Sequence, residues 1–315
     1  MTHPRRFRFG AQLREPLHGR SWAETARQVE EWGYSTLFVP DHLQEHHGPI
    51  AVMSAVAAAT ERLRVGSLVF DNDFRHPMLL AKELATIDAM SGGRVELGIG
   101  AGWKREDYDQ SGIPMDPPGV RVDRLIEAVE VIRRCFTGEP FDFEGEHYTI
   151  RGATGHPAPA TAGGPPLIVA GGGPRMLRFA GRVASIVGVN PSIHSGVVDT
   201  AAARDGLAAA MDAKFGWVRE GAGDRFDELE LNAWVDVCSV TDDAAGFASA
   251  AASAFGLAPE EAAMALESPM VLVGTVDELC ERIEMRRDRW GFSYHVIGNG
   301  GIEAFAPIAA AMTGR

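Results

Sequence analysis

The sequence predicts a (β/α)8 barrel, and three observations lead to this fold class. Short apolar segments alternate along the chain with amphipathic segments of helical period. Eight such apolar segments can be distinguished, with helical crossovers between them, which is the pattern of a parallel sheet. A chain of 315 residues also has about the length that one such barrel needs. We therefore expect a single domain over residues 1–315, with insertions at about 139–166 and 241–270.

The eight predicted strands are short and mostly apolar, as strands covered on both faces are. They are residues 6–13, 35–39, 63–70, 95–100, 167–170, 186–189, 231–237 and 294–297. In a barrel, the active site lies at the carboxyl ends of the strands. The polar residues at those ends are therefore the candidates for function.

Local helix signals fall between these strands. Ser21 and Glu24 have the spacing of a capping box, and Gly33 ends the helix that they begin. Pro77 opens a later helix, because its missing N–H would be unsatisfied in the first turn in any case, and Gly92 ends it. The other helices predicted in the first half of the chain are residues 49–60 and 122–136.

Two segments interrupt the alternation. Residues 141–150 alternate apolar and polar side chains around Gly145, which predicts a β-hairpin. Residues 151–166 are rich in Gly, Pro, Ala and Thr, and we expect a mobile loop near the barrel mouth. Residues 241–269 are rich in alanine and predict two helices inserted before the last strand.

Composition excludes several classes of protein. The net charge of -13 argues against nucleic-acid binding, which needs a basic footprint. No apolar run approaches the roughly 20 residues of a membrane span, and the N-terminus lacks the apolar core of a secretory signal. We expect a cytoplasmic protein. Cys135, Cys238 and Cys280 have no CxxC spacing, so neither a disulfide framework nor a zinc site is indicated.

Two glycine-rich turns follow predicted strands. Gly100-Ala101-Gly102 follows the fourth strand, where backbone without side chains can approach a ligand closely. Gly171-Gly172-Gly173-Pro174-Arg175 follows the fifth strand and leads into a helix. Free N–H groups of a glycine turn and a helix N-terminus bind anions, and Arg175 adds a positive charge. The second turn therefore predicts a phosphate site.

Polar residues follow the other strands as well, and they are the remaining candidates for the site: Gln12, Asp41, His42, Asp71, Asn72 and Asn190. A carboxylate and an imidazole at one strand end could hold or relay a proton. A metal site of Asp41, His42, His46 and His47 is not predicted, because these residues lack the helical H-x-x-x-H and H-E-x-x-H spacings.

Several motifs at matching spacing resemble one known family. They are the strand Gly66-Ser67-Leu68-Val69, then Arg75-His76-Pro77, Leu80-Ala81-Lys82, Asp88 with Ser91-Gly92-Gly93-Arg94, and Leu97-Gly98-Ile99-Gly100-Ala101-Gly102-Trp103. The chain thereby resembles the luciferase-like monooxygenase superfamily, and in particular its actinobacterial branch that uses the deazaflavin coenzyme F420. The resemblance implies a barrel of the bacterial luciferase-like type, insertions that shape the substrate side of the pocket, and a homodimer.

The resemblance also assigns roles to the strand ends. Asp41 and His42 fall where the family has an Asp-His pair beside the deazaflavin ring. The bond between Leu68 and Val69 falls where many members have a non-prolyl cis peptide that backs one face of the ring. The residues expected to bind the cofactor are Gln12, Asp41, Leu68, Val69, Asp71, Asn72, Gly100, Gly102, Asp107, Gly171, Gly172, Gly173, Pro174, Arg175 and Asn190.

Asp107 is the third expected catalytic residue, with Asp41 and His42. The family usually has a glutamate followed by an aromatic residue at this place, and this chain has Asp107-Tyr108, one methylene shorter. In sugar-phosphate-oxidising relatives this acid protonates or supports the cofactor. The shorter side chain argues against direct proton transfer, though not against binding.

These observations predict an F420-dependent oxidoreductase that transfers a hydride between the deazaflavin and a small organic substrate. Reduction of an activated C=C or C=N bond is the favoured direction, and oxidation of an alcohol is the reverse possibility. An FMN-dependent luciferase-like monooxygenase is the alternative, since FMN also presents a phosphate to the glycine turn. A non-catalytic flavin-binding or deazaflavin-binding protein is the alternative from another class. No G-x-S-x-G or GxGxxG motif indicates a hydrolase or a nicotinamide-binding fold.

Overall fold

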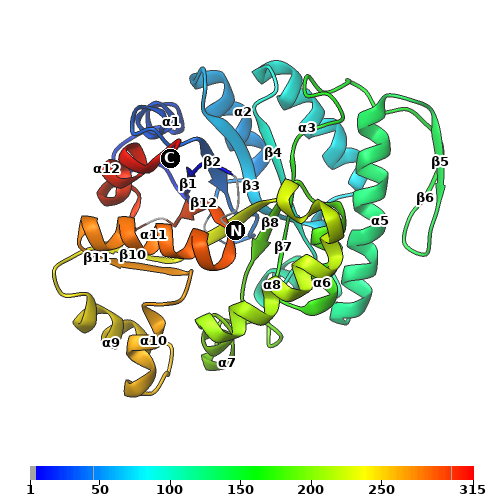
Figure 1. The fold of residues 1–315 in the computed structure, drawn as a ribbon. Coiled ribbons are helices and arrows are strands. Elements are labelled where there is room, and N and C mark those ends of the chain that lie inside the picture. The colour runs from blue at the N-terminus through cyan, green and yellow to red at the C-terminus, as the bar shows by residue number, and fades with distance from the viewer. Residues whose placement is uncertain (1–4, 45, 299) are drawn as a thin grey trace. The chain divides into compact units, whose positions relative to one another are not determined.

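A computed structural model describes residues 5–44, 46–298 and 300–315 (Figure 1). Eight strands close into a barrel in the order β1-β12-β9-β8-β7-β4-β3-β2, which confirms the predicted fold class. The strands are β1 (Arg8–Gln12), β2 (Thr36–Val39), β3 (Arg64–Asp71), β4 (Val95–Gly100), β7 (Leu167–Gly171), β8 (Ile186–Val189), β9 (Glu230–Val235) and β12 (Phe292–Ile297). Strand pairs such as β1 with β12 and β3 with β4 are parallel.

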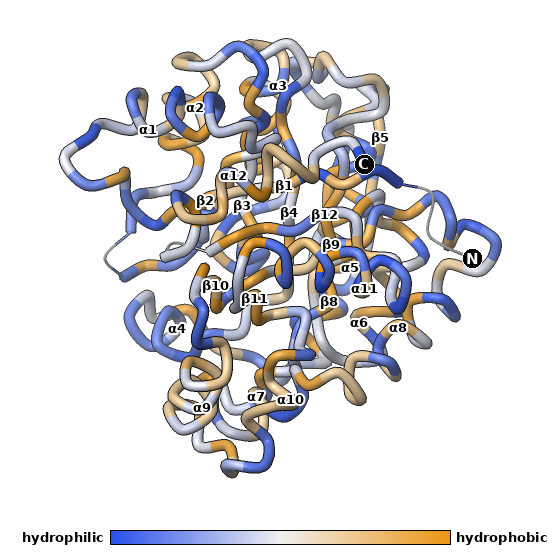
Figure 2. The backbone as a smooth tube through the Cα atoms, turned by 60° about the vertical axis from the view of Figure 1, so that its left-hand side comes forward, coloured by the Kyte–Doolittle hydropathy of each residue, from blue (hydrophilic) through white to orange (hydrophobic). Residues whose placement is uncertain are grey.

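The chain divides into two compact units. Unit 1 comprises residues 1–13, 28–36 and 169–315, and unit 2 comprises residues 14–27 and 37–168. Many residues of the barrel strands in both units are hydrophobic, drawn in orange in Figure 2, and the helices contribute further buried apolar residues such as Leu84 and Phe305. All six residues of β4 are buried, as expected for a strand covered on both faces.

Helix boundaries in unit 2 follow the local signals. Ser21 N–H donates to Glu24 Oε2 at 2.8 Å and Glu24 N–H to Ser21 Oγ at 3.2 Å, which completes the predicted capping box of α1. Pro77 is the first residue of α3, and Gly92 ends it with φ 69°. The bounds are α1 (Trp22–Glu31, which continues into unit 1), α2 (Pro49–Ala59), η1 (Asn72–Phe74), α3 (Pro77–Ser91), α4 (Arg105–Ser111) and α5 (Pro118–Thr137).

The predicted hairpin is present and lies beside α5 (Figure 1). It consists of antiparallel β5 (Phe141–Glu144) and β6 (Thr149–Ala153). The Glu127 carboxylate of α5 accepts the N–H groups of Glu146, His147 and Tyr148 at 2.8, 2.9 and 3.1 Å. One half-buried carboxylate therefore accepts three successive N–H groups of the hairpin tip and holds the tip against the helix.

The loop that follows the hairpin does not lie where the sequence suggested. Thr161 N–H donates to Asp88 Oδ2 at 2.8 Å, and Leu97 N–H donates to Pro166 O at 3.0 Å. Asp88 lies in the last turn of α3, next to the amino end of β4. The expectation of a loop near the mouth is therefore wrong for residues 161–166. Asp88 is fully buried, and a buried carboxylate needs N–H and O–H donors, which Thr161 supplies.

In unit 1, the predicted strand 231–237 is two strands. β9 ends at Val235, and β10 begins at Val237 and pairs with β11 in a separate two-stranded sheet. The chain turns at Asp236, whose N–H donates to Met270 O at 3.0 Å. The two predicted inserted helices are present as α9 and the short α10. The bounds are α6 (Pro174–Val183), α7 (Thr200–Asp205), α8 (Ala208–Ala222), η2 (Gly223–Glu228), β10 (Val237–Val240), α9 (Ala244–Ala254), η3 (Pro259–Glu261), α10 (Ala262–Ala265), β11 (Val271–Gly274), α11 (Val276–Trp290) and α12 (Ile302–Met312).

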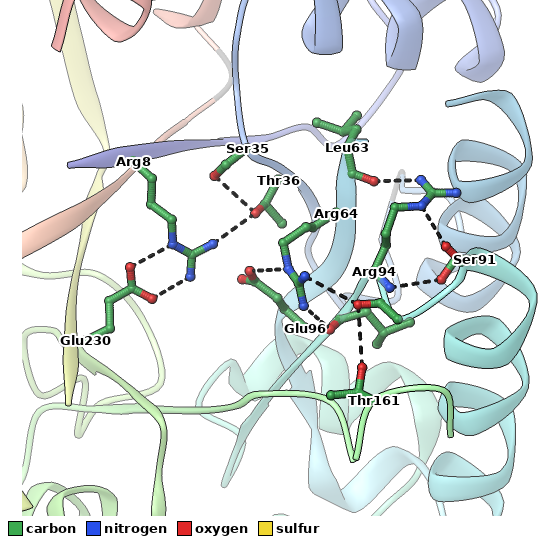
Figure 3. Close-up of polar contacts among 12 residues, drawn as sticks. Arg8, Ser35, Thr36, Leu63, Arg64, Ser91, Arg94, Glu96, Thr161 and Glu230 are labelled. Carbon is green, nitrogen blue, oxygen red and sulfur yellow. Dashed lines mark hydrogen bonds and ion pairs between the residues drawn. The ribbon is translucent and has the colours of Figure 1, made fainter. Parts of the chain in front are cut away.

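Ion pairs occupy the amino ends of the strands in each unit (Figure 3). In unit 1, Arg8 of β1 donates to Glu230 of β9 at 2.7 Å and lies 3.5 Å above the Tyr294 ring. In unit 2, Arg64 of β3 donates to Glu96 of β4 at 2.9 Å. Charges in such positions are tolerated because each has an opposite partner. In barrels, this end contributes to stability and the carboxyl end to chemistry.

Replacing Asp88 tests the anchoring of the loop. We expect Asp88→Ala to lower the free energy of unfolding by about 2–3 kcal/mol, because the Thr161 N–H and the Val95 N–H lose a buried acceptor. Urea denaturation measures this change. The control is Asp109→Ala, which removes an exposed carboxylate of α4 and should change stability little. Equal unfolding midpoints for Asp88→Ala and wild type would contradict the anchoring role.

Candidate functional site

Polar side chains of unit 2 gather at the carboxyl ends of neighbouring strands. Asp41 and His42 follow β2, and Asp71 ends β3. Asp107 and Tyr108 lie in α4, which follows β4. The barrel topology therefore brings these five residues to the end where active sites lie.

His42 is paired with Asp107. His42 Nδ1 lies 2.6 Å from Asp107 Oδ2, and the other carboxylate oxygen accepts from Leu43 N–H at 3.0 Å and from Gln44 Nε2 at 2.8 Å. The Asp107 side chain is 2% exposed and that of His42 is 20% exposed. The Trp103 and His42 rings meet nearly at right angles, with centroids 5.7 Å apart. The ring is thus fixed through Nδ1, and Nε2 has no hydrogen-bond partner among the described residues.

The sequence suggests that Asp41 and its neighbour His42 could hold or relay a proton together. In the structure, Asp41 is instead paired with Arg75. Its carboxylate forms a two-bond ion pair with Arg75, in which Nη2 donates to Oδ1 at 2.9 Å. Oδ2 also accepts the N–H of Asp71 at 3.0 Å. A planar guanidinium matches both oxygens of a buried carboxylate, which is why Asp41 turns to Arg75. The binding of a cofactor by Asp41 stays a prediction.

Asp71 and Tyr108 form a second buried group. Tyr108 Oη donates to Asp73 Oδ2 at 3.0 Å and lies 3.3 Å from Asp71 Oδ1. Burial raises the pKa of Asp71 to about 7, a hydrogen bond from the Asp73 N–H lowers it, and the charges of Asp73 and Asp41 raise it further. Burial likewise raises the pKa of the Tyr108 phenol. Arg124 donates to Asp73 Oδ1 at 2.7 Å, so a guanidinium lies against this buried group.

The glycines after β4 are required by the protein's own side chains. A Cβ at Gly102, where φ is +74°, would overlap Tyr108 Oη and lie 2.5 Å from Asp71 Oδ2. A Cβ at Gly100 would lie 2.8 Å from Val69 Cγ2. We expected this turn to leave room for a ligand, and at Gly102 that room is filled. The buried Asp71–Tyr108 contact explains the glycine there.

The third strand has the backbone that the resemblance implied. The Leu68–Val69 peptide bond is cis, and the pairing of β3 with β4 shifts register between Ser67 and Phe70. Asn72, directly after β3, is 3% exposed and donates from Nδ2 to Tyr148 Oη at 3.3 Å. The tip of the hairpin therefore reaches the carboxyl end of β3.

Unit 1 contains the second glycine turn, after β7. Gly173 precedes α6 as its N-cap without a side-chain hydrogen bond, and a Cβ at this position would meet nothing within 4 Å. The Asn190 N–H donates to Gly171 O at 2.9 Å. Asn190 Oδ1 is buried and has no hydrogen-bond partner among the described residues. These residues fit a ligand that brings an anion for the helix N-terminus and a donor for Asn190.

Gln12, at the end of β1, is also in unit 1. Its side-chain oxygen accepts from Trp234 Nε1 at 2.7 Å, and the residue is 8% exposed. Trp234 belongs to β9, so the contact joins the ends of two strands. A role of Gln12 in cofactor binding stays a prediction.

The sequence interpretation missed two cations that organise these groups. The sequence places Arg75 only in a helix start and in a family motif, although a buried acid at the end of the neighbouring strand β2 needs such a partner. Lys214 is 1% exposed in α8. It lies on the face formed by Met211, Phe215 and Val218, and a lysine at an apolar position of the helical repeat was the available signal.

The described ranges hold no cluster of three or more His, Cys, Asp or Glu side chains arranged to bind a metal ion. Among the helices of those same ranges, none combines the length and the apolar character of a membrane span.

Comparison with known proteins places these features in a family. The luciferase-like monooxygenase family profile matches residues 6–216. A protein of Nakamurella multipartita named F420-dependent glucose-6-phosphate dehydrogenase is 33% identical over 304 residues, which cover 92% of this chain and 84% of that protein. A protein of the same name from Nocardia farcinica is 38% identical over 178 residues, 53% of this chain and 52% of the relative. The second alignment thus spans about half the length of the relative.

Solved structures share the fold at low sequence identity. A coenzyme F420 dependent tetrahydromethanopterin reductase from Methanopyrus kandleri has a TM-score of 0.75 at 20% identity, covering 98% of this chain and 99% of that one. Monooxygenase RslO1 from Streptomyces bottropensis has a TM-score of 0.70 at 23% identity, covering 96% of each chain. The fold, the matched profile and the relative aligned over 84% of its length agree, and the chain belongs to the luciferase-like monooxygenase family.

Proposed function

We propose that this protein is an F420-dependent oxidoreductase in which His42, paired with Asp107, exchanges a proton with a small organic substrate. The observation that carries the proposal is the 2.6 Å contact between His42 Nδ1 and the buried Asp107 carboxylate. A histidine fixed in this way presents Nε2 as acid or base, and its partner stabilises the charged form. The group lies at the carboxyl end of β2, where barrel enzymes carry their chemistry.

Two observations support F420 as the cofactor. The relative that aligns along 84% of its own length is named as F420-dependent. In unit 1, the open turn at Gly173 and the unpartnered Asn190 Oδ1 fit a ligand with a phosphate and hydrogen-bond donors. Gly171, Gly172, Gly173, Pro174, Arg175 and Asn190 would hold that part of the cofactor. The bound deazaflavin supplies the hydride chemistry, and the protein supplies position and charge.

For Asp107, the proposal assigns a positioning role. Its two oxygens are used by His42, the Leu43 N–H and the Gln44 side chain, so it holds the imidazole rather than a ligand. The short side chain suits this role, because it places Asp107 Oδ2 at 2.6 Å from His42 Nδ1. We assign a positioning role to Asp41 as well, because it pairs with Arg75 and accepts the Asp71 N–H.

The reaction that we favour is reduction of an activated C=C or C=N bond, with His42 giving the proton that accompanies the hydride. Oxidation of an alcohol is the second candidate, and the dehydrogenase name of the Nakamurella multipartita relative favours it. The same pair then works in reverse, with His42 taking the hydroxyl proton as general base.

Ligand binding tests the cofactor. We expect purified protein to bind F420 at least about tenfold more tightly than FMN in side-by-side fluorescence titrations. The reduced cofactor should then be consumed with enones or imines, or the oxidised cofactor reduced with alcohols. Preference for FMN would overturn the F420 assignment and direct the search to oxygen-dependent reactions. F420 binding without turnover of enones, imines or alcohols would favour a non-catalytic deazaflavin-binding protein.

Variants of the pair test the proton role. We expect His42→Gln and Asp107→Asn to lower kcat by about 10²- to 10⁴-fold, because general acid–base catalysis contributes on that order. Affinity for F420 should change little. Glu106→Gln is the matched control, since it removes a carboxylate whose side chain is 56% exposed from the same helix. Normal kcat in both pair variants would show that the proton moves by another route.

Asp71 gives a pH test of the neighbouring buried group. Its pKa is raised from 3.8 to about 7, chiefly by burial. Between these values the folded protein holds a proton that the unfolded chain has lost. The contribution of Asp71 to stability is therefore present below the unfolded pKa and is lost as the pH rises through the folded pKa.

We expect Asp71→Asn to remove this dependence, because the amide stays neutral and can still accept from the Asp73 N–H. The wild type should lose stability relative to the variant by up to about 1.4 kcal/mol per pH unit across the window. Urea unfolding of both proteins from about pH 5 to about pH 7 measures the difference. Asp109→Asn should give a difference that does not vary with pH. Parallel curves for Asp71→Asn and wild type would mean that Asp71 is already ionised at the lower pH.

A further inference from the structure

We propose that Lys214 and Asp205 are positioning residues that hold the glycine turn after β7 in the shape that receives a phosphate group. This inference rests on the proposed function, in which that phosphate belongs to F420. All the residues involved lie in unit 1.

Lys214 is a buried cation with two acceptors. Its ammonium Nζ donates to Gly172 O at 2.6 Å and to Asp205 Oδ2 at 2.6 Å. The Lys214 side chain is 2% exposed, and Trp217 covers it with the ring centroid 5.8 Å from Nζ. Charge-assisted hydrogen bonds of this length are stronger than neutral ones, so the orientation of the Gly172 carbonyl is strongly constrained.

That carbonyl determines where the next amide points. Gly172 C=O and Gly173 N–H belong to one planar peptide unit, which is not among the cis bonds of the chain. In a trans peptide these two groups point in opposite directions. Because the carbonyl points to Lys214, the Gly173 N–H points away from it. This N–H stands at the N-terminus of α6 and has no partner among the described residues.

Asp205 fixes a second turn to the same lysine. Its Oδ2 accepts the N–H of Ser192 at 2.7 Å as well as the Lys214 ammonium. Gly172 packs directly on this second turn, since a Cβ there would lie 2.5 Å from Ser192 N and from Pro191 C. The turns after β7 and β8 are thus joined at one carboxylate and one ammonium. Asn190 directly follows β8 and begins the second turn, and its side-chain oxygen has no hydrogen-bond partner among the described residues.

The helix that carries Asp205 is itself anchored to the inserted segment. Arg204 forms two hydrogen bonds with Glu261, at 2.8 and 3.0 Å, and Ser268 Oγ donates to Gly206 O at 2.6 Å. Asp205 is therefore held from both sides in the chain. Because the backbone on either side of Asp205 is anchored, the Asp205 carboxylate can hold the Lys214 ammonium in place.

The test compares two ligands that differ only in the phosphate-bearing part. F420 and its deazaflavin riboside, which lacks the phosphate, are titrated by fluorescence against wild type, Lys214→Met, Lys214→Arg and Asp205→Asn. We expect Lys214→Met to weaken F420 binding about tenfold or more, while affinity for the riboside changes less than about twofold. Lys214→Arg should restore part of the loss, because it keeps the buried cation. Thermal unfolding of each variant reports whether the fold is intact.

Arg289→Gln is the matched control. Arg289 pairs with Asp212 of the same helix as Lys214, but its side chain is 43% exposed. If Lys214→Met does not fold, Asp205→Asn carries the test, because it removes the charge pair and keeps the shape of the side chain. It should show the same selective loss of F420 affinity.

The outcomes separate this inference from the proposed function. Wild type that fails to bind F420 overturns the proposed function, and the inference with it. Wild type that binds F420, with an equal affinity in Lys214→Met, overturns the inference alone. An equal loss for F420 and the riboside also overturns it, because the lysine would then be merely structural.

Discussion

The buried ion pair between Asp41 and Arg75 is the interaction on which the arrangement at the ends of β2 and β3 depends. It neutralises a carboxylate whose side chain is 3% exposed, and the same carboxylate accepts the N–H of Asp71. The two strand ends are thus joined by one acid. Because Asp41 is occupied by Arg75, His42 pairs with Asp107 instead, and two adjacent residues belong to two separate polar pairs. The candidate proton-transfer pair, His42 with Asp107, therefore depends on Arg75 binding Asp41.

The two glycine turns show how the same residue type serves opposite purposes. After β4, Gly102 is needed because Tyr108 and Asp71 fill the space that a side chain would take. After β7, Gly173 borders open space, and its amide at the start of α6 has no partner within the ranges that the structure describes. The first glycine permits close packing inside the protein, and the second permits approach from outside. A glycine-rich motif at a strand end therefore does not by itself indicate a ligand.

Charges are distributed along the strands according to their task. At the amino ends, Arg8 pairs with Glu230 in unit 1 and Arg64 pairs with Glu96 in unit 2 (Figure 3). These charged groups are used in binding one another rather than a ligand. At the carboxyl ends, His42 Nε2 and Asn190 Oδ1 have no hydrogen-bond partner in the part of the chain that the structure describes. Asp71 is held near the point of ionisation by burial. In each unit, the ion pairs thus lie at the amino ends of strands and the candidate site residues at the carboxyl ends.

The sequence by itself determined the barrel, its helix caps and the position of the turns. These features depend on local patterns: apolar runs for strands, Ser21 with Glu24 for a cap, and Gly92 for a helix end. The cis bond at Leu68–Val69 could be expected from the motif around it.

Only the tertiary structure decided which polar groups pair. His42 meets Asp107 across 65 positions, Asp41 meets Arg75 across 34, and Gly172 meets Lys214 across 42. It also decided that Thr161 binds Asp88 at the amino end of β4, away from the mouth where the loop was expected. Residue type and spacing bring several acids and cations to one end of a sheet. The choice among them is made by distance and burial, because each buried charge takes the partner that its packed neighbours leave within reach.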